Sequence, residues 1–393
     1  MSHIVNESQE LLESIIHWRR ELHQIPEVEL NLPKTSAYVQ KQLKEIGIPF
    51  ESGIATSGIV GLIQGSKPGK TIALRADMDA LPMKEYTQVS YASKNDNMHS
   101  CGHDVHTAML LGTAKMLNAR KSELHGNVKL IFQPAEENPG GAKIMIDEGV
   151  LENPKVDRIL GMHVGNIVKG LDYGKIGVKP NALMAASDVF NLKIKGVGCH
   201  GSAPHNGTDP ITIASYVITA LQQIVSREVN ATEPMVLSFG KISGGTTFNV
   251  IPEEVELIGI ARTFSQETRS FVRKRFEEIA TSVTQGLRGT CEIDYFHSYP
   301  PLINDPGFTD AFVSSAEKVL DPEEIVLLED PVMGAEDMSY YLEKIPGTFF
   351  FLGTNNPEKG IVYSNHSSKF DVDEEVLWKG PALMVQTCLD YLR

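Results

Sequence analysis

Cysteine, histidine and acidic residues recur where their side chains could bind metal ions or transfer protons. Residues 98–106 contain a Cys-x-His pair, Cys101 and His103. A thiolate and an imidazole at this spacing can reach one ion, but a metal site needs three or four protein ligands in a fixed geometry. The remaining ligands must therefore come from other parts of the chain.

Several predicted strands end at such side chains. The runs 70–77, 128–132 and 158–164 are rich in apolar and β-branched residues, which is typical of buried strands. They are followed by, or contain near their ends, Asp77, Asp79, Glu136, Glu137 and His163. Because ligand sites in open α/β sheets form at the carboxyl ends of strands, we expect these side chains to converge.

The candidate metal ligands are Cys101, His103, Glu137, His163 and His366, the last in a loop. They exceed what one tetrahedral ion needs, so a site for two ions is predicted. Two ions about 3.5–4 Å apart can lower the pKa of a shared water toward about 7 and polarise a carbonyl, which is hydrolytic chemistry. Thiolate and imidazole favour zinc or another late first-row ion such as cobalt or nickel, and manganese also suits carboxylate with imidazole.

The adjacent acids Glu136 and Glu137 could serve two different roles, one as a metal ligand and the other as a general base. If one carboxylate binds metal, its neighbour is close enough to take a proton from the activated water. We assign Glu137 as the ligand and Glu136 as the general base.

Helices and strands predicted from apolar periodicity would position these groups. Helices are expected over residues 4–22, 34–46 and 107–119, the second ending at Gly47. The third places the Cys-x-His pair at a helix N-terminus, where the helix dipole favours a thiolate. The runs 58–65 and 70–77, separated by a Ser-Lys-Pro-Gly turn, predict a hairpin.

The pattern changes near Pro180 and predicts two domains. Residues 1–180 and 298–393 form an α/β catalytic domain with an open, largely parallel sheet, and residues 181–297 form an inserted α+β domain. In the insertion, strands are expected over 188–195, 235–239, 254–263 and 291–296, with helices over 210–227 and 265–285 on one face of an antiparallel sheet.

Composition limits the partners and the compartment. The formal net charge of -14 over 393 residues argues against nucleic acid or an anionic membrane as a partner. The four cysteines are scattered without a C-x-x-C pair, and there is no signal-peptide pattern, so we expect a cytoplasmic protein with reduced thiols. The glycines near residues 61–69 do not form a nucleotide-binding motif, which makes a nucleotide-binding enzyme a weak alternative.

Seven segments together resemble the dinuclear-metal amidohydrolases, which include hippurate hydrolase, plant auxin-conjugate hydrolases, N-acetyldiaminopimelate deacetylase and bacterial aminoacylases. The segments are 19–27 (RRELHQIPE), 75–82 (RADMDALP), 98–104 (MHSCGHD), 132–137 (FQPAEE), 161–163 (GMH), 200–205 (HGSAPH) and 248–252 (FNVIP). They occur in order over nearly the whole chain, which is far more specific than any single motif.

The resemblance implies a catalytic domain with an inserted lid that dimerises. It carries over the five metal ligands and Glu136 as base. His200 resembles the lid histidine that stabilises the oxyanion in a neighbouring subunit's active site, and Asn249 and Arg262 resemble lid residues that hold the substrate. An arginine fork suits a bidentate contact with the substrate carboxylate.

Three segments depart from related patterns. Related di-zinc peptidases have His-x-Asp in place of Asp77-Met78-Asp79 and a bridging aspartate at the position of Cys101. We therefore assign Asp77 and Asp79 to orienting the ligands and Cys101 to bridging the two ions. His99, Asp104 and His106 are given a similar supporting role, and the usual His-Ser-Pro-x-Phe appears as residues 366–370 (HSSKF).

The predicted activity is hydrolysis of the amide bond of N-acyl amino acids or small peptides by a homodimer or higher homo-oligomer with two divalent ions per subunit. One alternative keeps the chemistry but makes the protein an amino-, di- or endopeptidase acting on unblocked peptides. An alternative of another class is a regulator that binds metal or ligand at a disabled site. The presence of Glu136 argues against this last reading.

Overall fold

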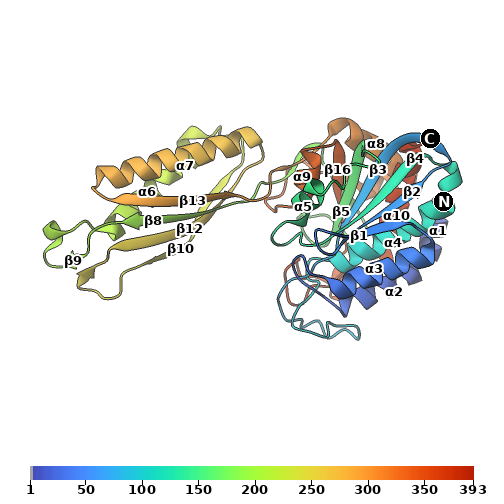
Figure 1. Cartoon of the computed structure of the whole chain (residues 1–393), viewed down its shortest axis with the longest axis horizontal. Coiled ribbons are helices and arrows are strands. Elements are labelled where there is room, and N and C mark those ends of the chain that lie inside the picture. The colour runs from blue at the N-terminus through green and yellow to red at the C-terminus, as the bar shows by residue number, and fades with distance from the viewer. Residues whose placement is uncertain (1–2) are drawn as a thin grey trace. The chain divides into compact units, whose positions relative to one another are not determined.

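The computed structural model describes residues 3–393, which divide into two compact units. Unit 1 comprises the residues up to Leu183 together with Ile303–Val332 and Glu336–Arg393. Unit 2 comprises Met184–Leu302 and Met333–Ala335. Figure 1 labels the elements of both units.

Unit 1 is built on an eight-stranded mixed sheet. Its strands, in spatial order, are β1 (Phe50–Ile54), β2 (Gly58–Gln64), β4 (His125–Gln133), β3 (Lys67–Asp77), β5 (Arg158–Val164), β16 (Gly347–Leu352), β6 (Ile176–Val178) and β15 (Ile325–Leu327). The central strands β4, β3, β5 and β16 are parallel to one another. The predicted α/β fold with a largely parallel sheet is confirmed.

The helices of unit 1 bury an extensive apolar core against this sheet. They are α1 (His3–Glu10), α2 (Leu12–His23), α3 (Pro33–Ile46), α4 (His103–Ala119), α5 (Gly141–Asp147), α8 (Pro306–Ala316), α9 (Met338–Leu342) and α10 (Lys379–Tyr391). In Figure 1 α4 lies beside α2 and α3. Because α4 also packs on α10 and β3, its residues are almost all buried. No helix within residues 3–393 is long and apolar enough to cross a membrane.

Two local predictions were wrong. The strands β2 and β3 do not form a hairpin, because β4 lies between them, antiparallel to β2 and parallel to β3. The first predicted helix is divided into α1 and α2 at Leu11. Gly47 ends α3 as predicted, with a left-handed φ of 84°.

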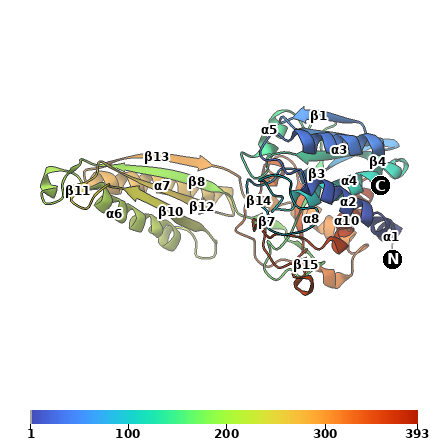
Figure 2. The same cartoon turned by 90° about the horizontal axis from the view of Figure 1, so that it is seen from below.

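Unit 2 is a four-stranded antiparallel sheet with two long helices. The strands are ordered β10 (Val236–Gly244), β12 (Glu254–Arg262), β8 (Asp188–Lys195) and β13 (Thr290–His297), and the helices are α6 (Pro210–Gln223) and α7 (Gln266–Gly286). Alternate residues of β8 and β12 are buried in one apolar cluster with both helices, which therefore cover the same face. Figure 2 shows α6 and α7 running along the strands.

Short elements complete the two units. Two-stranded sheets pair β9 (Cys199–His200) with β11 (Val250–Ile251) and β7 (Asn181–Met184) with β14 (Leu302–Asn304). The short helices are η1 (Lys121–Glu123), η2 (Pro204–Asn206), η3 (Ile224–Glu228), η4 (Pro322–Glu324), η5 (Pro357–Lys359) and η6 (Glu374–Val376).

Replacing Phe276 by alanine is expected to destabilise unit 2 by about 3–5 kcal/mol. The Phe276 ring is fully buried, and its centroid lies 4.5 Å from that of Phe190 and 5.6 Å from that of Tyr295, so truncation leaves a cavity. Urea unfolding followed by circular dichroism measures the change. Phe271→Ala on the same helix is the control, because Phe271 is 37% exposed and should change stability by only about 0.5 kcal/mol. Equal losses in the two variants would contradict the packing described for unit 2.

Candidate metal centre

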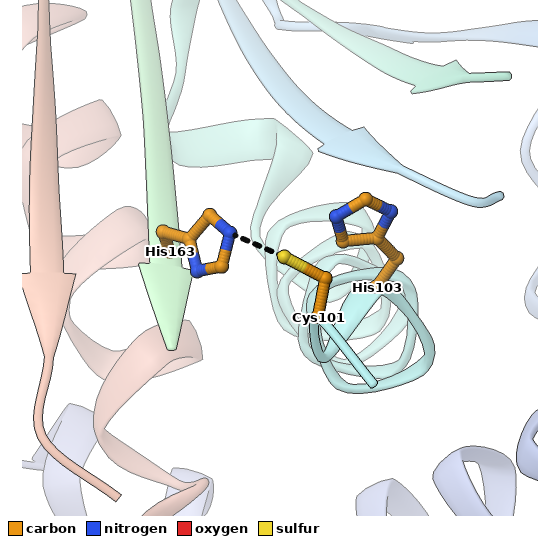
Figure 3. Close-up of side chains that lie close together, drawn as sticks. All are labelled: Cys101, His103 and His163. Carbon is orange, nitrogen blue, oxygen red and sulfur yellow. Dashed lines mark hydrogen bonds between the residues drawn. The ribbon is translucent and has the colours of Figure 1, made fainter. Parts of the chain in front are cut away.

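The start of α4 fixes the positions of Cys101 and His103. Gly102 caps the helix with a left-handed φ of 89°, and a Cβ at this position would lie 2.6 Å from Val164 Cγ2. Glycine is therefore required between the two side chains. Figure 3 shows Cys101 and His103 projecting from the start of α4 toward the region where His163 of β5 also points.

The five predicted ligands come together around the thiol of Cys101. The Cys101 Sγ atom lies 3.3 Å from His163 Nε2 and 3.3 Å from His366 Nε2. The His366 Nε2 atom in turn lies 3.1 Å from Glu137 Oε1. Two groups of candidate ligand atoms share Cys101, with all atoms of each group within 4.8 Å of one another: Cys101, His103 and His163, and Cys101, Glu137 and His366. This overlap suits a pair of ions with one shared ligand.

The burial of the site is asymmetric. Cys101, His103 and His163 are buried, whereas Glu137 is partly exposed and His366 is exposed. The side of the site formed by Glu137 and His366 therefore faces solvent within unit 1, which is the side where a small substrate could enter.

The charges at the site fit divalent cations. The buried His103 Nε2 makes no hydrogen bond with any described residue. Burial alone would lower the pKa of His103, but the carboxylates of Asp77 and Asp79 raise it to about 10. Burial, together with Glu137 and Glu136, raises the pKa of Cys101 well above its ordinary value. The carboxylates thus create a negative potential that a metal ion would neutralise while stabilising the thiolate.

Hydrogen bonds fix the ring orientations of His163, a candidate metal ligand, and of its neighbour His106. His163 Nδ1 lies 2.7 Å from the carbonyl oxygen of Val164, which can only accept a hydrogen bond. Because Nδ1 must then carry the proton, Nε2 presents its lone pair toward Cys101. His106 Nε2 accepts from the Val164 N–H at 2.9 Å, so its Nδ1–H donates to Asp77 Oδ1 at 2.6 Å.

The carboxylate of Asp79 orients the two adjacent glutamates. Asp79 Oδ1 accepts from the Glu136 N–H at 2.9 Å, and Oδ2 accepts from the Glu137 N–H at 3.0 Å. This geometry agrees with the orienting role predicted for Asp79. The Asp77 carboxylate is bound to His106, and the Thr107 hydroxyl donates to the backbone carbonyl of Asp77.

Glu136 is buried beside acids that the sequence reasoning missed. Burial, Glu336, Glu137 and Asp337 raise the pKa of Glu136 well above its ordinary value. The Asp337 N–H donates to Glu136 Oε1 at 3.4 Å. Such an environment favours a carboxylate that accepts a proton readily.

The two missed acids, Glu336 and Asp337, both pair with Arg75, and Asp337 also accepts hydrogen bonds from Gln133. Arg75 Nη2 lies 2.6 Å from Asp337 Oδ1 and 3.0 Å from Glu336 Oε1, and Gln133 Nε2 donates to both oxygens of Asp337. Arg75 lies in a motif quoted for the family resemblance, but Glu336 and Asp337 stand in no recognisable ligand spacing. Their long-range pairing with Arg75 was visible only in the structure.

The remaining predicted site residues lie on unit 2. His200 is exposed, and its Nδ1 accepts from the Ser202 N–H at 3.1 Å. Nε2 is therefore the ring nitrogen with which His200 could contact a bound molecule. Asn249 is also exposed. Arg262 donates to Ser187 Oγ at 2.9 Å and forms no ion pair with any residue between 3 and 393. Its guanidinium could therefore donate to a carboxylate of a bound molecule. The roles predicted for these three residues stay predictions.

An open α/β sheet that brings carboxylates and an imidazole at its strand ends next to a thiol and an imidazole at the start of α4 is typical of a metal-dependent hydrolase. The model of peptidase family M20/M25/M40 matches residues 73–390. The chain therefore belongs to this family and is a metal-binding hydrolase of amide bonds. Membership confirms the resemblance found in the sequence.

Relatives and a solved structure agree with this assignment. The chain is 41% identical to thermostable carboxypeptidase 1 of Saccharolobus solfataricus, over 95% of this chain and 94% of the relative. It is 40% identical to N-acetyl-L-cysteine deacetylase of Bacillus subtilis, over 96% of this chain and 88% of the relative. The crystal structure of the YXEP protein of Bacillus subtilis, a dinuclear metal-binding M20 peptidase, matches with a TM-score of 0.84 and 34% identity, covering 98% of this chain and 99% of that chain.

Proposed function

We propose that the protein is a two-metal amidohydrolase that cleaves the amide bond of N-acyl amino acids or small N-acyl peptides. The observation that carries the proposal is the gathering of five ligand side chains around the Cys101 thiol, beside the buried carboxylate of Glu136.

Cys101, His103 and His163 would hold one ion, and Cys101, Glu137 and His366 the other. Zinc or manganese suits this donor set, with cobalt and nickel as alternatives. When bound, two such ions lower the pKa of water and polarise the substrate carbonyl.

Glu136 accepts the proton of the attacking water and later delivers it to the nitrogen of the leaving amine. The Asp79 carboxylate holds the backbone of Glu136 and so aims its side chain. The tetrahedral intermediate collapses with cleavage of the carbon–nitrogen bond, and the products are a carboxylate and an amine.

Unit 2 supplies the groups that would bind the substrate. Arg262 would pair with the substrate carboxylate, Asn249 would hold the substrate, and His200 would stabilise the oxyanion in a neighbouring subunit. This last role requires at least a homodimer. Support for the role of Arg262 comes from its half-buried guanidinium without an ion-pair partner among the described residues.

A peptidase acting on unblocked peptides is the second candidate. It is favoured by the 41% identity to a carboxypeptidase, whereas the 40% identity to an N-acetyl-L-cysteine deacetylase favours N-acyl substrates. A disabled regulator is disfavoured because the sequence retains Glu136 next to a complete set of ligand side chains.

A substrate panel separates the two hydrolytic candidates. We expect kcat/KM for N-acetyl amino acids to exceed that for unblocked dipeptides of the same residue by roughly tenfold or more, since one well-placed polar contact in the site discriminates by at least that factor. Release of free amine is measured for both substrate classes at saturating metal. A preference for the unblocked dipeptides would make the protein a peptidase, and no turnover of either class would leave a binding protein.

A further inference from the structure

The motif over residues 19–27 supplies two buried side chains for which the proposed function has no role. Arg19 and His23 lie on the last turns of α2, and each is 1% exposed. Both point to Asp104, the second residue of α4, which is also 1% exposed. Burying a guanidinium and a carboxylate costs desolvation free energy. We therefore ask what these charges do next to the candidate metal ligands.

The carboxylate of Asp104 receives both partners on one oxygen. Arg19 Nε donates to Asp104 Oδ2 at 2.9 Å, and His23 Nδ1 lies 2.8 Å from the same atom. Asp104 therefore binds α2 to the first turn of α4, directly after His103.

The other arm of the Arg19 guanidinium reaches the segment that follows His366. Arg19 Nη2 donates to Asp371 Oδ1 at 2.9 Å, and Nη1 donates to Glu374 Oε1 at 3.0 Å. The His366 N–H donates to the Ser100 carbonyl at 2.8 Å, which joins this loop to the segment that precedes Cys101. One guanidinium thus spans the two segments that carry three of the five ligands.

We propose that Arg19 is a positioning residue that holds the start of α4 and the loop 366–371 in the register that lets Cys101, His103 and His366 bind two ions together. His23 supports it by sharing Asp104. The inference rests on the metal-ligand set of the proposed function. Groups outside the ligand set that orient ligands commonly change metal affinity about 10- to 100-fold when they are replaced.

The planar fork of arginine is essential to this role. Its Nε and Nη2 atoms address two carboxylates on different segments at fixed angles, whereas a lysine ammonium is a single point charge. Arg19→Lys therefore keeps the buried charge but cannot keep the contacts with Asp104, Asp371 and Glu374 together.

Arg20 offers a matched control on the same helix. It also pairs with Glu374 and stacks over Tyr91, but it is 45% exposed and contacts neither Asp104 nor Asp371. If a general effect of exchanging an arginine of α2 for lysine, such as a loss of helix stability, were responsible, Arg20→Lys and Arg19→Lys would have similar effects.

The experiment measures metal affinity rather than turnover. The full-length wild type, Arg19→Lys, Asp371→Asn and Arg20→Lys are stripped with a chelator and titrated with Co²⁺ and Zn²⁺ against a chromophoric competitor. The absorption of Co²⁺ bound to the Cys101 thiolate is recorded, and urea unfolding of the metal-free proteins is followed in parallel. We expect Arg19→Lys to weaken affinity about 10- to 100-fold and to alter the Co²⁺ spectrum, Asp371→Asn to weaken it less, and Arg20→Lys to leave it unchanged.

The outcomes distinguish this inference from the proposed function. Wild-type affinity and spectrum in a folded Arg19→Lys variant would overturn the positioning role and leave the metal site intact. A wild type that binds no ions would overturn the proposed function itself. Should Arg19→Lys fail to fold, Asp371→Asn decides, because it removes the negative charge that pairs with Arg19 at a carboxylate that is 21% exposed: unchanged affinity and spectrum in this variant would overturn the inference.

Discussion

Replacing Glu136 by glutamine is expected to lower kcat for an N-acetyl amino acid by about 10²–10⁴-fold. Glutamine has nearly the same shape and can keep the backbone contact with Asp79, but it cannot accept the proton of the attacking water. Steady-state amine release at saturating metal gives kcat, and metal analysis of the same samples establishes that both ions are still bound.

The exposed Glu10 provides the control for this substitution. Glu10→Gln should leave kcat unchanged, because Glu10 lies on α1 and none of the proposed ligand sets includes it. If Glu136→Gln retains more than a tenth of the wild-type kcat with its ions bound, another group transfers the proton.

Serine in place of Cys101 is expected to weaken the affinity for at least one ion by roughly a hundredfold or more. Changes in groups that only orient ligands reach about a hundredfold, and Cys101 is shared by both candidate ligand groups. At limiting metal, activity should be lost, and excess metal should restore it in part. Metal content after gel filtration and turnover across a metal titration measure these effects, and chelation of the wild type should abolish turnover.

Cys291→Ser is the matched control for this prediction. Cys291 lies on β13 of unit 2, and no candidate ligand group includes it. Unchanged metal content in Cys101→Ser would show that the thiol is not a ligand, and activity that survives chelation would contradict the metal dependence of the reaction.

Much of the candidate site could be predicted from the sequence because its parts follow strand ends. Glu137 and His163 lie where parallel strands reach the same edge of the sheet, and the Cys-x-His pair lies at the start of α4. The structure brings these residues together with His366. The strand ends, the start of α4 and one loop histidine were therefore enough to collect the candidate ligands, whose role as metal ligands stays a prediction.

The surroundings of Glu136 could not be predicted in the same way. Asp337 pairs with Arg75 across 262 residues of sequence, and Arg19 pairs with Asp371 across 352. Nothing in the local spacing of these residues shows which charges will meet, because that depends on how α9 and the loop after His366 pack.

In the fold, too, most elements set by local sequence patterns were predicted correctly, whereas a strand pairing between distant segments was not. Alternation and turn residues correctly predicted the antiparallel sheet of unit 2 and its two helices. The error at β2 and β3 arose because two neighbouring β-rich runs with a turn between them favour a hairpin, while the partner of both strands begins at residue 125.

Because β4 lies between β2 and β3, the sheet of unit 1 cannot assemble in the order in which the ribosome delivers its strands. A nascent chain that ends before His125 contains both β2 and β3 but not the strand that separates them. Their facing edges have only each other to pair with, and any such hairpin must open before β4 can enter. An edge that is left unpaired before β4 arrives can pair with another chain, so we expect chains that end before His125 to aggregate more readily than longer ones.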